Sequence, residues 1–404
     1  MSSDYDVCVV GGGIIGLATA RALTHAFDGM SVVVVEKEND VGLHQTGHNS
    51  GVLHSGLYYQ PGSKKAALCV SGRRAMLEFC ENAGIPVEAT GKLVVATDDA
   101  ELPALEELHR RGIANGLQGL HRLDAAAMRA HEPNVAGSHG LLVPETAVVD
   151  FGAVAAALAS ELQSAGHALL TGAAVESIEN APGRVGVATG RATLTARLLV
   201  NCAGLHADTV ARMAGIEPQV RIIPFRGEYY SLTGGAEDLV RGLVYPVPDP
   251  RLPFLGVHFT RRSTGVVEVG PNAVLAAGRE HYRGTRPKLR ELASTLGFPG
   301  FRRIARRHWR TGITEVAGSL SRAVYARRAR RLVPGVKAHH LKRAGSGIRA
   351  QAVTRTGDLA DDFVIEATDR TIHVLNAPSP GATASLGIGV HIAEIAGDRR
   401  SSWS

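Results

Sequence analysis

The sequence has few cysteines, and it lacks the spacings in which cysteines bind metals or exchange disulfides. Four occur among 404 residues, and no two form a Cys-x-x-Cys pair. Zinc sites and thioredoxin-type dithiols need such pairs, so we expect neither a metal nor a redox dithiol. Isolated cysteines with apolar neighbours are typical of small core side chains in a reduced, cytosolic protein. The four are Cys8, Cys69, Cys80 and Cys202.

Long apolar runs and targeting segments are also missing. The apolar start, 7–23, follows Asp4 and Asp6, where a signal peptide would carry positive charge, and three glycines at 11–13 interrupt it. No other stretch is long enough to cross a bilayer, and there is no Arg- and Ser-rich transit segment. We therefore expect a cytoplasmic protein, with peripheral contact at the inner face of the cell membrane as a further option.

Acidic residues are scarce between 302 and 331. The chain has a net charge of +6, and this stretch holds ten arginines against a single acid, Glu315. A solvated helical face is the ordinary interpretation, and a membrane-surface or partner-docking patch is the sharper one. No recognition motif accompanies the cluster, so we do not expect nucleic acid as a partner. The ten are Arg302, Arg303, Arg306, Arg307, Arg310, Arg322, Arg327, Arg328, Arg330 and Arg331.

Apolar periodicity predicts an α/β fold. A buried strand at 5–10, a helix at 14–25 and a second buried parallel strand at 31–35 form the βαβ unit of a dinucleotide fold. Between 224 and 272 short β-rich pieces alternate with Pro/Gly turns, which predicts a mostly antiparallel sheet. Further helices are expected at 63–83, 101–111, 123–130, 151–165, 302–331 and 382–395, and further strands at 92–96, 175–178, 185–188, 198–202 and 371–375.

A Gly11-x-Gly13-x-x-Gly16 motif joins the first strand to the first helix. Gly11 permits the tight turn, Gly13 lets the backbone reach a pyrophosphate, and Gly16 lets the helix pack on the strand. The helix N-terminus then offers N–H groups and positive potential to the phosphates. Glu36 lies 20 residues beyond Gly16, where a ribose-binding acid belongs, and its charge argues against the 2′-phosphate of NADP.

Two later segments favour FAD over NAD. A flavoenzyme that uses NAD(P)H usually needs a second dinucleotide fold, and no second Gly-x-Gly-x-x-Gly follows a strand. The segment 200–204 is a strand that ends in small residues, as where backbone packs against an extended cofactor. The segment 376–383 joins a strand to a helix through a proline–glycine turn. A helix N-terminus aimed at the flavin pyrimidine edge would stabilise reduced flavin, and an ordinary N-cap is the alternative.

The fold class that follows is α/β: a discontinuous Rossmann-like FAD-binding domain with a second, substrate-binding domain built on a mostly antiparallel sheet. Two domains also suit the length, because 404 residues exceed what one core normally holds. The FAD-binding domain is expected to comprise 1–90, 145–223 and 340–404, and the substrate-binding domain 91–144 and 224–339.

Polar residues gather in a loop at 48–59 and in the predicted second sheet. His48 and His54 lie in the loop, where either could orient flavin or contact substrate, and a structural role is equally open. His258 stands alone among apolar neighbours, so a satisfied core histidine and a catalytic one are equally open. Arg349 follows a glycine-rich turn, from which it could grip a carboxylate in a bidentate way.

With these residues assembled, the chain resembles the L-2-hydroxyglutarate dehydrogenases/oxidases, in the D-amino-acid oxidase-like branch of FAD enzymes. The resemblance implies oxidation of L-2-hydroxyglutarate to 2-oxoglutarate with FAD, and an acceptor other than NAD: oxygen, a quinone or an electron-transfer protein. Eukaryotic members look mitochondrial, and this chain lacks their leader, which suggests a bacterial form. The segments that carry the resemblance are 48–59 (HNSGVLHSGLYY), 224–228 (PFRGE), 245–260 (YPVPDPRLPFLGVHFT), 270–276 (GPNAVLA), 347–351 (GIRAQ) and 376–385 (NAPSPGATAS).

The reaction requires a base for the hydroxyl proton and cations or hydrogen-bond donors for a 2-hydroxy diacid. The expected catalytic residues are His258, slightly preferred as the base, His54 and Arg349. The expected substrate ligands are Tyr245, Tyr58, Arg226, Gln351 and Thr383. The expected cofactor ligands are Gly11, Gly13, Ile14, Ile15, Gly16, Glu36, Lys37, His48, Asn49, Ser50, Gly51, Val175, Ala203, Gly204, Gly347, Pro380, Gly381, Ala382 and Thr383.

Alternative functions stay open on the sequence. An amine or amino-acid oxidase, similar to glycine or sarcosine oxidase, and a glycerol-3-phosphate dehydrogenase would share the fold. A non-catalytic, nucleic-acid-associated FAD protein belongs to a different class and is suggested only by the arginines. The His-rich loop leaves covalent attachment of FAD open.

Overall fold

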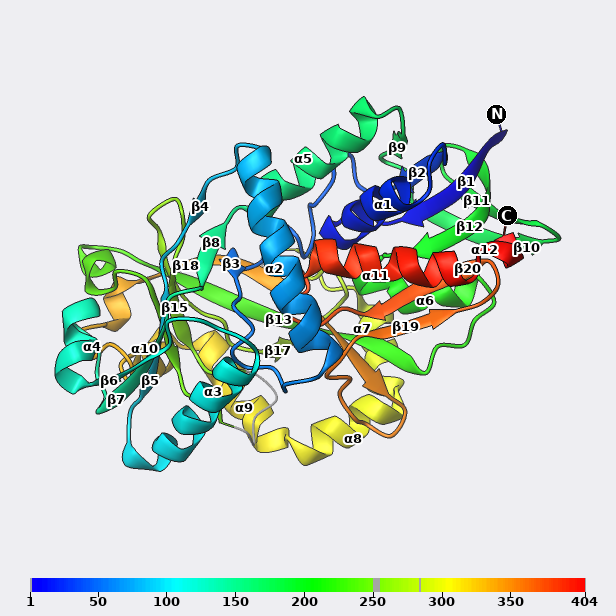
Figure 1. Cartoon of the computed structure of the whole chain (residues 1–404). Coiled ribbons are helices and arrows are strands. Elements are labelled where there is room, and N and C mark those ends of the chain that lie inside the picture. The colour runs from blue at the N-terminus through cyan, green and yellow to red at the C-terminus, as the bar shows by residue number, and fades with distance from the viewer. Residues whose placement is uncertain (1, 250–254, 283–284, 404) are drawn as a thin grey trace.

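The computed structural model describes residues 2–249, 255–282 and 285–403, and it places one large sheet toward each end of the molecule (Figure 1). Part of the 245–260 segment, residues 250–254, lies outside the described residues. Within the described ranges, no helix combines the length and the apolar character needed to cross a membrane.

The first sheet has the strand order β10–β11–β12–β1–β2–β9, with β20 beside β12 and β19 beside β20. Its centre is parallel, because β1 pairs in parallel with β2 and β12. In β1, Val7 and Val9 enter one core while Cys8 and Val10 enter another, so both faces of the strand are buried there and its last four residues are all apolar. The strands are β1 (Ser2–Val10), β2 (Val32–Val35), β9 (Ala168–Leu170), β10 (Val175–Ala181), β11 (Arg184–Thr189), β12 (Thr193–Asn201), β19 (Val364–Ala367) and β20 (Thr371–Asn376).

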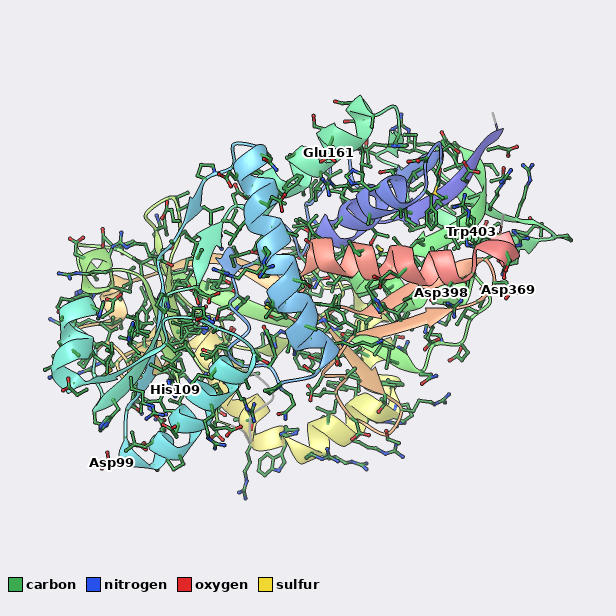
Figure 2. All side chains as sticks on the ribbon, in the orientation of Figure 1. Asp99, His109, Glu161, Asp369, Asp398 and Trp403 are labelled. Carbon is green, nitrogen blue, oxygen red and sulfur yellow. The ribbon has the colours of Figure 1, made fainter. Side chains whose placement is uncertain are left out.

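Helices cover both faces of this sheet. On one face α1 packs between α5 and α11, and Arg21 of α1 pairs with Glu161 of α5 at 2.8 Å (Figure 2 labels Glu161). At the C-terminus the ring of Trp403 meets that of Phe27 edge-on at 5.9 Å, which fixes the end of the chain to α1. The helices of this half are α1 (Ile14–Ala26), α2 (Lys64–Asn82), α5 (Phe151–Ser164), α6 (Ala207–Met213), α11 (Ser385–Asp398), α12 (Arg400–Trp403) and the 3-10 turn η2 (Gly204–His206).

The second sheet has the order β17–β13–β16–β15–β14–β5–β7–β6, with β18 also paired to β13. Its pairs are antiparallel except for β14 with β5, which confirms the mostly antiparallel prediction. The strands are β5 (Lys92–Ala96), β6 (His121–Asp124), β7 (His139–Val143), β13 (Val220–Leu232), β14 (Leu243–Pro246), β15 (His258–Arg261), β16 (Val267–Gly270), β17 (Val274–Leu275) and β18 (Leu341–Thr354).

Helices and short turns surround this second sheet, and a small sheet of order β3–β8–β4 lies apart from both large sheets. Asp124 ends β6 and caps α4, because its side chain accepts from the Ala127 N–H at 2.8 Å. The helices are α3 (Leu102–Ala114), α4 (Ala125–His131), α7 (Leu289–Gly297), α8 (Pro299–Arg307), α9 (Trp309–Leu320), α10 (Arg322–Ala329), η1 (Asp99–Glu101), η3 (Ala236–Leu239) and η4 (Ala338–His340); the small strands are β3 (Val52–Leu53), β4 (Val87–Glu88) and β8 (Ala147–Val149).

Two long strands differ from the sequence prediction. The short pieces expected after 224 begin with a single strand, β13, and the glycine-rich turn expected before Arg349 is the middle of β18. Position 347 of this strand requires glycine, because the backbone of the loop after β2 approaches it closely. A Cβ at this position would lie 2.4 Å from the His48 carbonyl oxygen. Residues 220–223 and 341–354 therefore pair in the second sheet, although the sequence assigned them to the FAD-binding domain.

The basic stretch 302–331 is three helices rather than one. The chain leaves helical geometry at His308, between α8 and α9, and at Ser321, between α9 and α10. Ser321 is extended and its side chain caps α10 through the Val324 N–H, which is why a new helix starts there. The prediction of one continuous helix is therefore wrong, although most of the stretch is helical.

Candidate active site

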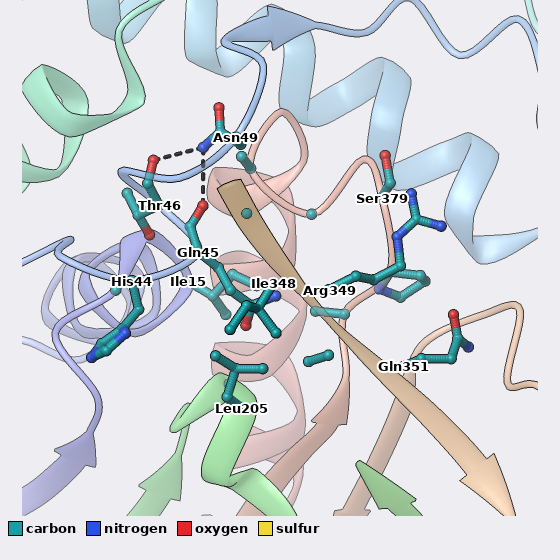
Figure 3. Close-up of a pocket in the computed structure, with 18 of the residues that line it drawn as sticks. Ile15, His44, Gln45, Thr46, Asn49, Leu205, Ile348, Arg349, Gln351 and Ser379 are labelled. Carbon is teal, nitrogen blue, oxygen red and sulfur yellow. Dashed lines mark hydrogen bonds between the residues drawn. The ribbon is translucent and has the colours of Figure 1, made fainter. Parts of the chain in front are cut away.

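A cavity of about 1030 Å³ runs along the boundary of the two large sheets. Its wall is built from the turn after β1, the loop after β2, the segment after β12, the strand β18 and the turn after β20 (Figure 3). The volume is at the upper end of the range for small-molecule and cofactor pockets. The carboxyl ends of the central parallel strands open into it, where α/β sheets bind their ligands.

The glycine motif forms one end of the cavity. Gly11 has φ +111°, and a Cβ there would lie 2.5 Å from the Cys202 carbonyl oxygen. Gly13 is the N-cap of α1, and Gly13, Ile14 and Ile15 line the cavity, with the Ile14 N–H donating to Thr46 Oγ1 at 3.0 Å. Gly16 does not line the cavity: a Cβ there would lie 1.9 Å from the Gly11 carbonyl oxygen, so it is the contact between helix and turn. This arrangement presents backbone N–H groups and a positive helix end to an anion.

Glu36 follows β2 and reaches back to this turn. Its Oε2 accepts from the Gly12 N–H at 2.7 Å, and its Oε1 accepts from the Glu38 N–H at 2.9 Å. The carboxylate is 8% exposed and lines the cavity. Each carboxylate oxygen has a second lone pair, so Glu36 can still accept hydrogen bonds from ribose hydroxyls.

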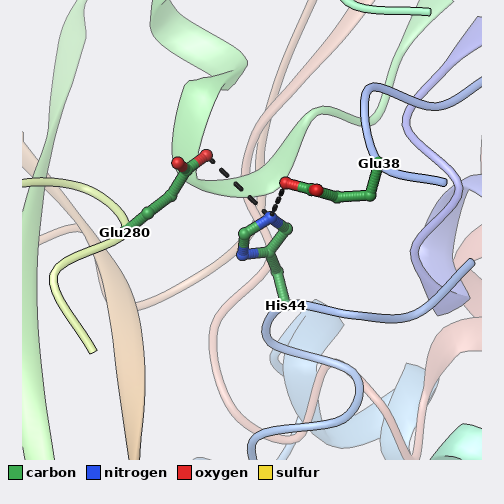
Figure 4. Close-up of side chains that lie close together, drawn as sticks. All are labelled: Glu38, His44 and Glu280. Carbon is green, nitrogen blue, oxygen red and sulfur yellow. Dashed lines mark hydrogen bonds and ion pairs between the residues drawn. The ribbon is translucent and has the colours of Figure 1, made fainter. Parts of the chain in front are cut away.

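A cluster of charged and polar side chains forms part of the cavity wall, to which Lys37, His44 and Glu280 contribute (Figure 4). His44 contacts Glu38 at 2.9 Å and Glu280 at 3.9 Å, which is close enough for the three side chains to hold a metal ion. The Lys37 ammonium already lies among these side chains, 2.7 Å from Glu280 and 2.6 Å from His44 Nε2. It supplies the positive charge that a metal ion would otherwise bring to the two carboxylates. The expected cofactor ligand Lys37 is thus committed to ion pairs that join the loop after β2 to the segment before α7.

Hydrogen bonds of Glu280 to His206, Lys37 and Lys288 hold the pKa of its carboxyl well below the usual range, against the opposing effect of burial. The Glu280 carboxylate therefore stays ionised at any ordinary pH.

The loop after β2 is braced internally. Asn49 Nδ2 donates to the carbonyl oxygens of Gln45, at 3.1 Å, and Thr46, at 2.6 Å (Figure 3), and its Oδ1 accepts from the Gly51 N–H at 2.8 Å. Gly51 does not line the cavity. It has φ +71°, and a Cβ there would lie 2.9 Å from the Val149 carbonyl oxygen. His48 and Ser50 do line it. His48 donates from Nδ1 to the Ser346 carbonyl oxygen at 3.1 Å, and burial lowers its pKa, so it is neutral.

The turn after β20 forms the opposite wall. Pro380, Gly381, Ala382 and Thr383, which the sequence predicts as cofactor ligands, all line the cavity, and α11 begins only at Ser385. Thr383 Oγ1 accepts from the His54 N–H at 3.0 Å, which joins this turn to the His-rich loop. The remaining expected cofactor residues Ile14, Ile15, Val175, Ala203, Gly204 and Gly347 also line the cavity.

Two of the predicted catalytic residues, His258 and His54, are histidines that line the cavity. His258 begins β15, its ring stacks on Tyr245 at 4.0 Å, and it is 6% exposed. Its Nδ1 lies 2.9 Å from the Gly256 carbonyl oxygen, which can only accept, so Nδ1 carries the proton. Burial, the largest cause, lowers the pKa of His258 to about 4. The ring is therefore neutral, with the lone pair on Nε2.

His54 is the second histidine. Burial lowers its pKa to about 3, and the charge of Lys92 acts in the same direction. Its Nδ1 is buried and has no hydrogen-bond partner among the described residues. No contact therefore fixes the tautomer of His54, in contrast to His258.

The expected anion-binding residues divide between two faces of β13 and β18. Arg349 and Gln351 line the cavity, and Arg349 pairs in register with Phe225 (Figure 3). Arg226 is the next residue on β13 and does not line the cavity, since strand residues alternate between faces. It pairs instead with Glu228 at 3.0 Å, so its expected role as a substrate ligand is not supported by its position.

The sequence did not single out Lys92, the first residue of β5. Lys92 is 1% exposed, and its Nζ lies 4.3 Å from the centre of the Tyr58 ring and 5.4 Å from that of Tyr245. Both tyrosines, the predicted substrate ligands, line the cavity. Burial lowers the pKa of Lys92 to about 7. The signal that could have found it is a lone lysine at the start of an otherwise apolar strand, KLVVA, in which every residue is buried.

Comparison with known proteins gives consistent matches over the whole chain. The family described as FAD dependent oxidoreductase matches residues 6–395. The "L-2-hydroxyglutarate dehydrogenase" of Indibacter alkaliphilus is 45% identical over 97% of this chain and 99% of that protein. The protein of the same name from Escherichia coli K12 is 42% identical, over 96% and 92%. The mitochondrial one of Homo sapiens is 40% identical, over 97% and 89%.

Solved structures share the fold at lower identity. An L-alpha-glycerophosphate oxidase from Mycoplasma pneumoniae, with FAD bound, matches with a TM-score of 0.79 and 23% identity, over 98% of this chain and 94% of that chain. A glycine oxidase from Geobacillus kaustophilus matches with a TM-score of 0.73 and 21% identity, over 98% and 95%. At these identities the likeness shows the fold alone.

Proposed function

Because the chain belongs to the FAD dependent oxidoreductase family, we propose that it oxidises L-2-hydroxyglutarate to 2-oxoglutarate with FAD as the hydride acceptor. The observation that carries the substrate is the similarity, at 40–45% identity over nearly the full length, to proteins named L-2-hydroxyglutarate dehydrogenase. The resemblance drawn from the 48–59 and 245–260 segments is thereby confirmed. The reaction removes two electrons from the C2 carbon, as a hydride, and one proton from the hydroxyl group.

The described residues fit a dinucleotide cofactor. The Gly11–Gly13 turn and the N-terminus of α1 would hold the pyrophosphate, and Glu36 would hold the adenosine ribose. The flavin end would then lie between the His48 loop and the turn at 380–383. FAD supplies the two-electron acceptor when bound.

His258 is the base of the proposed reaction. Its Nδ1–H is held by the Gly256 carbonyl, so its Nε2 lone pair is free to accept the substrate hydroxyl proton. A neutral histidine is required for this step, and burial keeps it neutral down to about pH 4. His54, whose tautomer is not fixed, has the secondary role of orienting the substrate.

Arg349 binds a substrate carboxylate in this proposal. It lies in β18, where the sheet rather than a loop positions it, and it lines the cavity. A guanidinium can hold a carboxylate with two parallel hydrogen bonds, which also fixes the orientation of the C2 carbon. Tyr245, Thr383 and Gln351 complete the polar contacts.

The electron acceptor in this proposal is oxygen, a quinone or an electron-transfer protein, reached from the cytoplasmic side of a membrane. The surface of α7, α8 and α9 combines exposed arginines with Leu289, Trp309, Ile313 and Leu320, each of which is more than half exposed. Cations and apolar side chains on one surface suit the headgroups of an anionic bilayer. Sedimentation with phosphatidylglycerol vesicles tests this membrane contact. Replacing Arg302, Arg306 and Arg307 with glutamate should abolish vesicle binding, whereas replacing the distant Arg129 with glutamate should not. Equal vesicle binding by the two variants would contradict the membrane contact.

A panel of substrates tests the proposed function. Under anaerobic conditions, L-2-hydroxyglutarate should bleach the flavin band and yield 2-oxoglutarate. Glycine, sarcosine, L-proline and glycerol 3-phosphate, which represent the other activities open to this fold, should leave the band unchanged. Bleaching by an amine or by glycerol 3-phosphate instead would assign the enzyme to another reaction.

A further inference from the structure

Lys92 is a buried cation that takes no part in the proton removal or the carboxylate binding of the proposed reaction. It lies at the start of β5 and faces the same side of the sheet as Val94, the residue that pairs with Tyr245 of the neighbouring strand β14. Its ammonium contacts the faces of Tyr58 and Tyr245, so the positive charge lies directly behind the wall of the cavity. The Tyr245 ring in turn stacks on His258.

The described surroundings of Lys92 show no opposite charge. Among the described residues, no carboxylate forms an ion pair or a hydrogen bond with its ammonium. The ionisable groups that face the two histidines and Lys92 are all cations or groups that stay neutral at ordinary pH. They are Tyr58, Tyr245, Lys65, Cys69 and Arg349.

Such a charge is costly to keep for structural reasons alone. Burial of an ammonium without a counter-ion costs several kcal/mol, whereas a cation–π contact returns about 0.5–2 kcal/mol. An apolar side chain of similar length would fill the same space without that cost. A charge retained at this expense, next to a cavity that accepts an anion, points to a role in the reaction.

We propose that Lys92 is a positioning residue whose buried, uncompensated positive charge adds to burial in opposing the protonation of His54 and His258, and favours an anionic substrate in the cavity beside Tyr58 and Tyr245. The inference rests on the proposed function, because it assigns the charge to a reaction that begins with an anion and needs a neutral base. Both effects come from the same positive charge. A like charge nearby opposes protonation of the imidazole rings, and the same field attracts a carboxylate.

Neutral replacements of Lys92 test the proposal. K92M and K92Q remove the charge at similar length, and K92R keeps it. The rate of flavin reduction by L-2-hydroxyglutarate is measured in anaerobic single turnovers from pH 3.5 to 8. Taking the ratio of each variant to wild type at the same pH cancels the ionisation of the substrate itself.

We expect the acid limb of the profile, which reports a histidine of pKa about 4 in wild type, to move upward by about one pH unit in K92M and K92Q and to stay in place in K92R. The same neutral variants should bind glutarate, a dicarboxylate that cannot be oxidised, at least ten-fold more weakly, as followed by the flavin spectrum. They should retain FAD and unfold at a temperature no lower than wild type.

An unmoved acid limb in both neutral variants would overturn the proposal. So would their failure to fold or to bind FAD, because Lys92 would then be a structural residue. A wild-type enzyme that L-2-hydroxyglutarate does not reduce would refute the proposed function instead, so the two failures are distinguishable.

Discussion

Replacing His258 with asparagine should slow flavin reduction by ~10²–10⁴-fold, the usual contribution of a general base. The side chain is neutral because burial lowers its pKa to about 4, and its proton is on Nδ1 because Gly256 offers only a carbonyl oxygen at 2.9 Å. Asparagine can keep a hydrogen bond to that carbonyl but has no lone pair with the basicity of Nε2. The lost step is therefore proton removal, and the bound FAD should be unaffected.

The assay is anaerobic stopped-flow mixing with L-2-hydroxyglutarate, followed at the flavin absorption band. His54→Asn is the matched control: it is a histidine of the same cavity, but no contact fixes its tautomer, so its reduction rate should fall by less than about ten-fold. The acid limb near pH 4 should disappear in the His258 variant and persist in the His54 variant. If the His258 variant reduced flavin at nearly the wild-type rate, or if His54→Asn showed the larger loss, the tautomer argument would be refuted.

Four further changes have defined outcomes. Glu36→Gln removes a charge that accepts two backbone hydrogen bonds, so FAD should bind about 10–100-fold more weakly in a fluorescence titration of the apoprotein; unchanged affinity would exclude Glu36 as a ribose ligand. Arg349→Met should raise the substrate dissociation constant by at least about ten-fold while FAD stays bound, and an unchanged constant would remove Arg349 from the substrate. Arg279 donates two hydrogen bonds to the buried Asp208, at 2.5 and 2.9 Å, and Arg212 remains as a second partner at 3.2 Å, so Arg279→Met should cost about 1.5–3 kcal/mol in denaturant unfolding; a loss below about 0.5 kcal/mol would contradict this. Burial lowers the pKa of Lys92 from 10.5 to about 7, so the unfolded chain binds more protons between those pH values and stability rises with pH; thermal melts should show wild type gaining on K92M across that window, and a constant difference would argue against it.

The first domain was predictable because its signals are local. A glycine turn between a buried strand and a helix, followed by a valine strand and Glu36, is read from consecutive residues, and the structure places each part as expected. The charge cluster around Lys37 was not predictable, because Glu280 comes from a segment far away in the sequence.

The second sheet was harder to predict because its pairing is not local. Gly345 and Gly347 suggested a turn, and only the long partner strand β13 shows that they belong to β18. Alternation along β13 then decided which side chains reach the cavity, placing Phe225 there and Arg226 on the other face. The side of a strand that faces the ligand depends on register, which spacing alone does not give.

The proposed reaction is hydride transfer from C2 of one enantiomer of 2-hydroxyglutarate to enzyme-bound flavin. The most direct test is anaerobic mixing of the holoenzyme with L-2-hydroxyglutarate, with its C2-deuterated form and with the D-enantiomer. We predict bleaching by the L-form, several-fold slower bleaching by the deuterated compound, and none by the D-form. Flavin that stays oxidised with L-2-hydroxyglutarate, or that is bleached equally by both enantiomers, would contradict the proposed reaction.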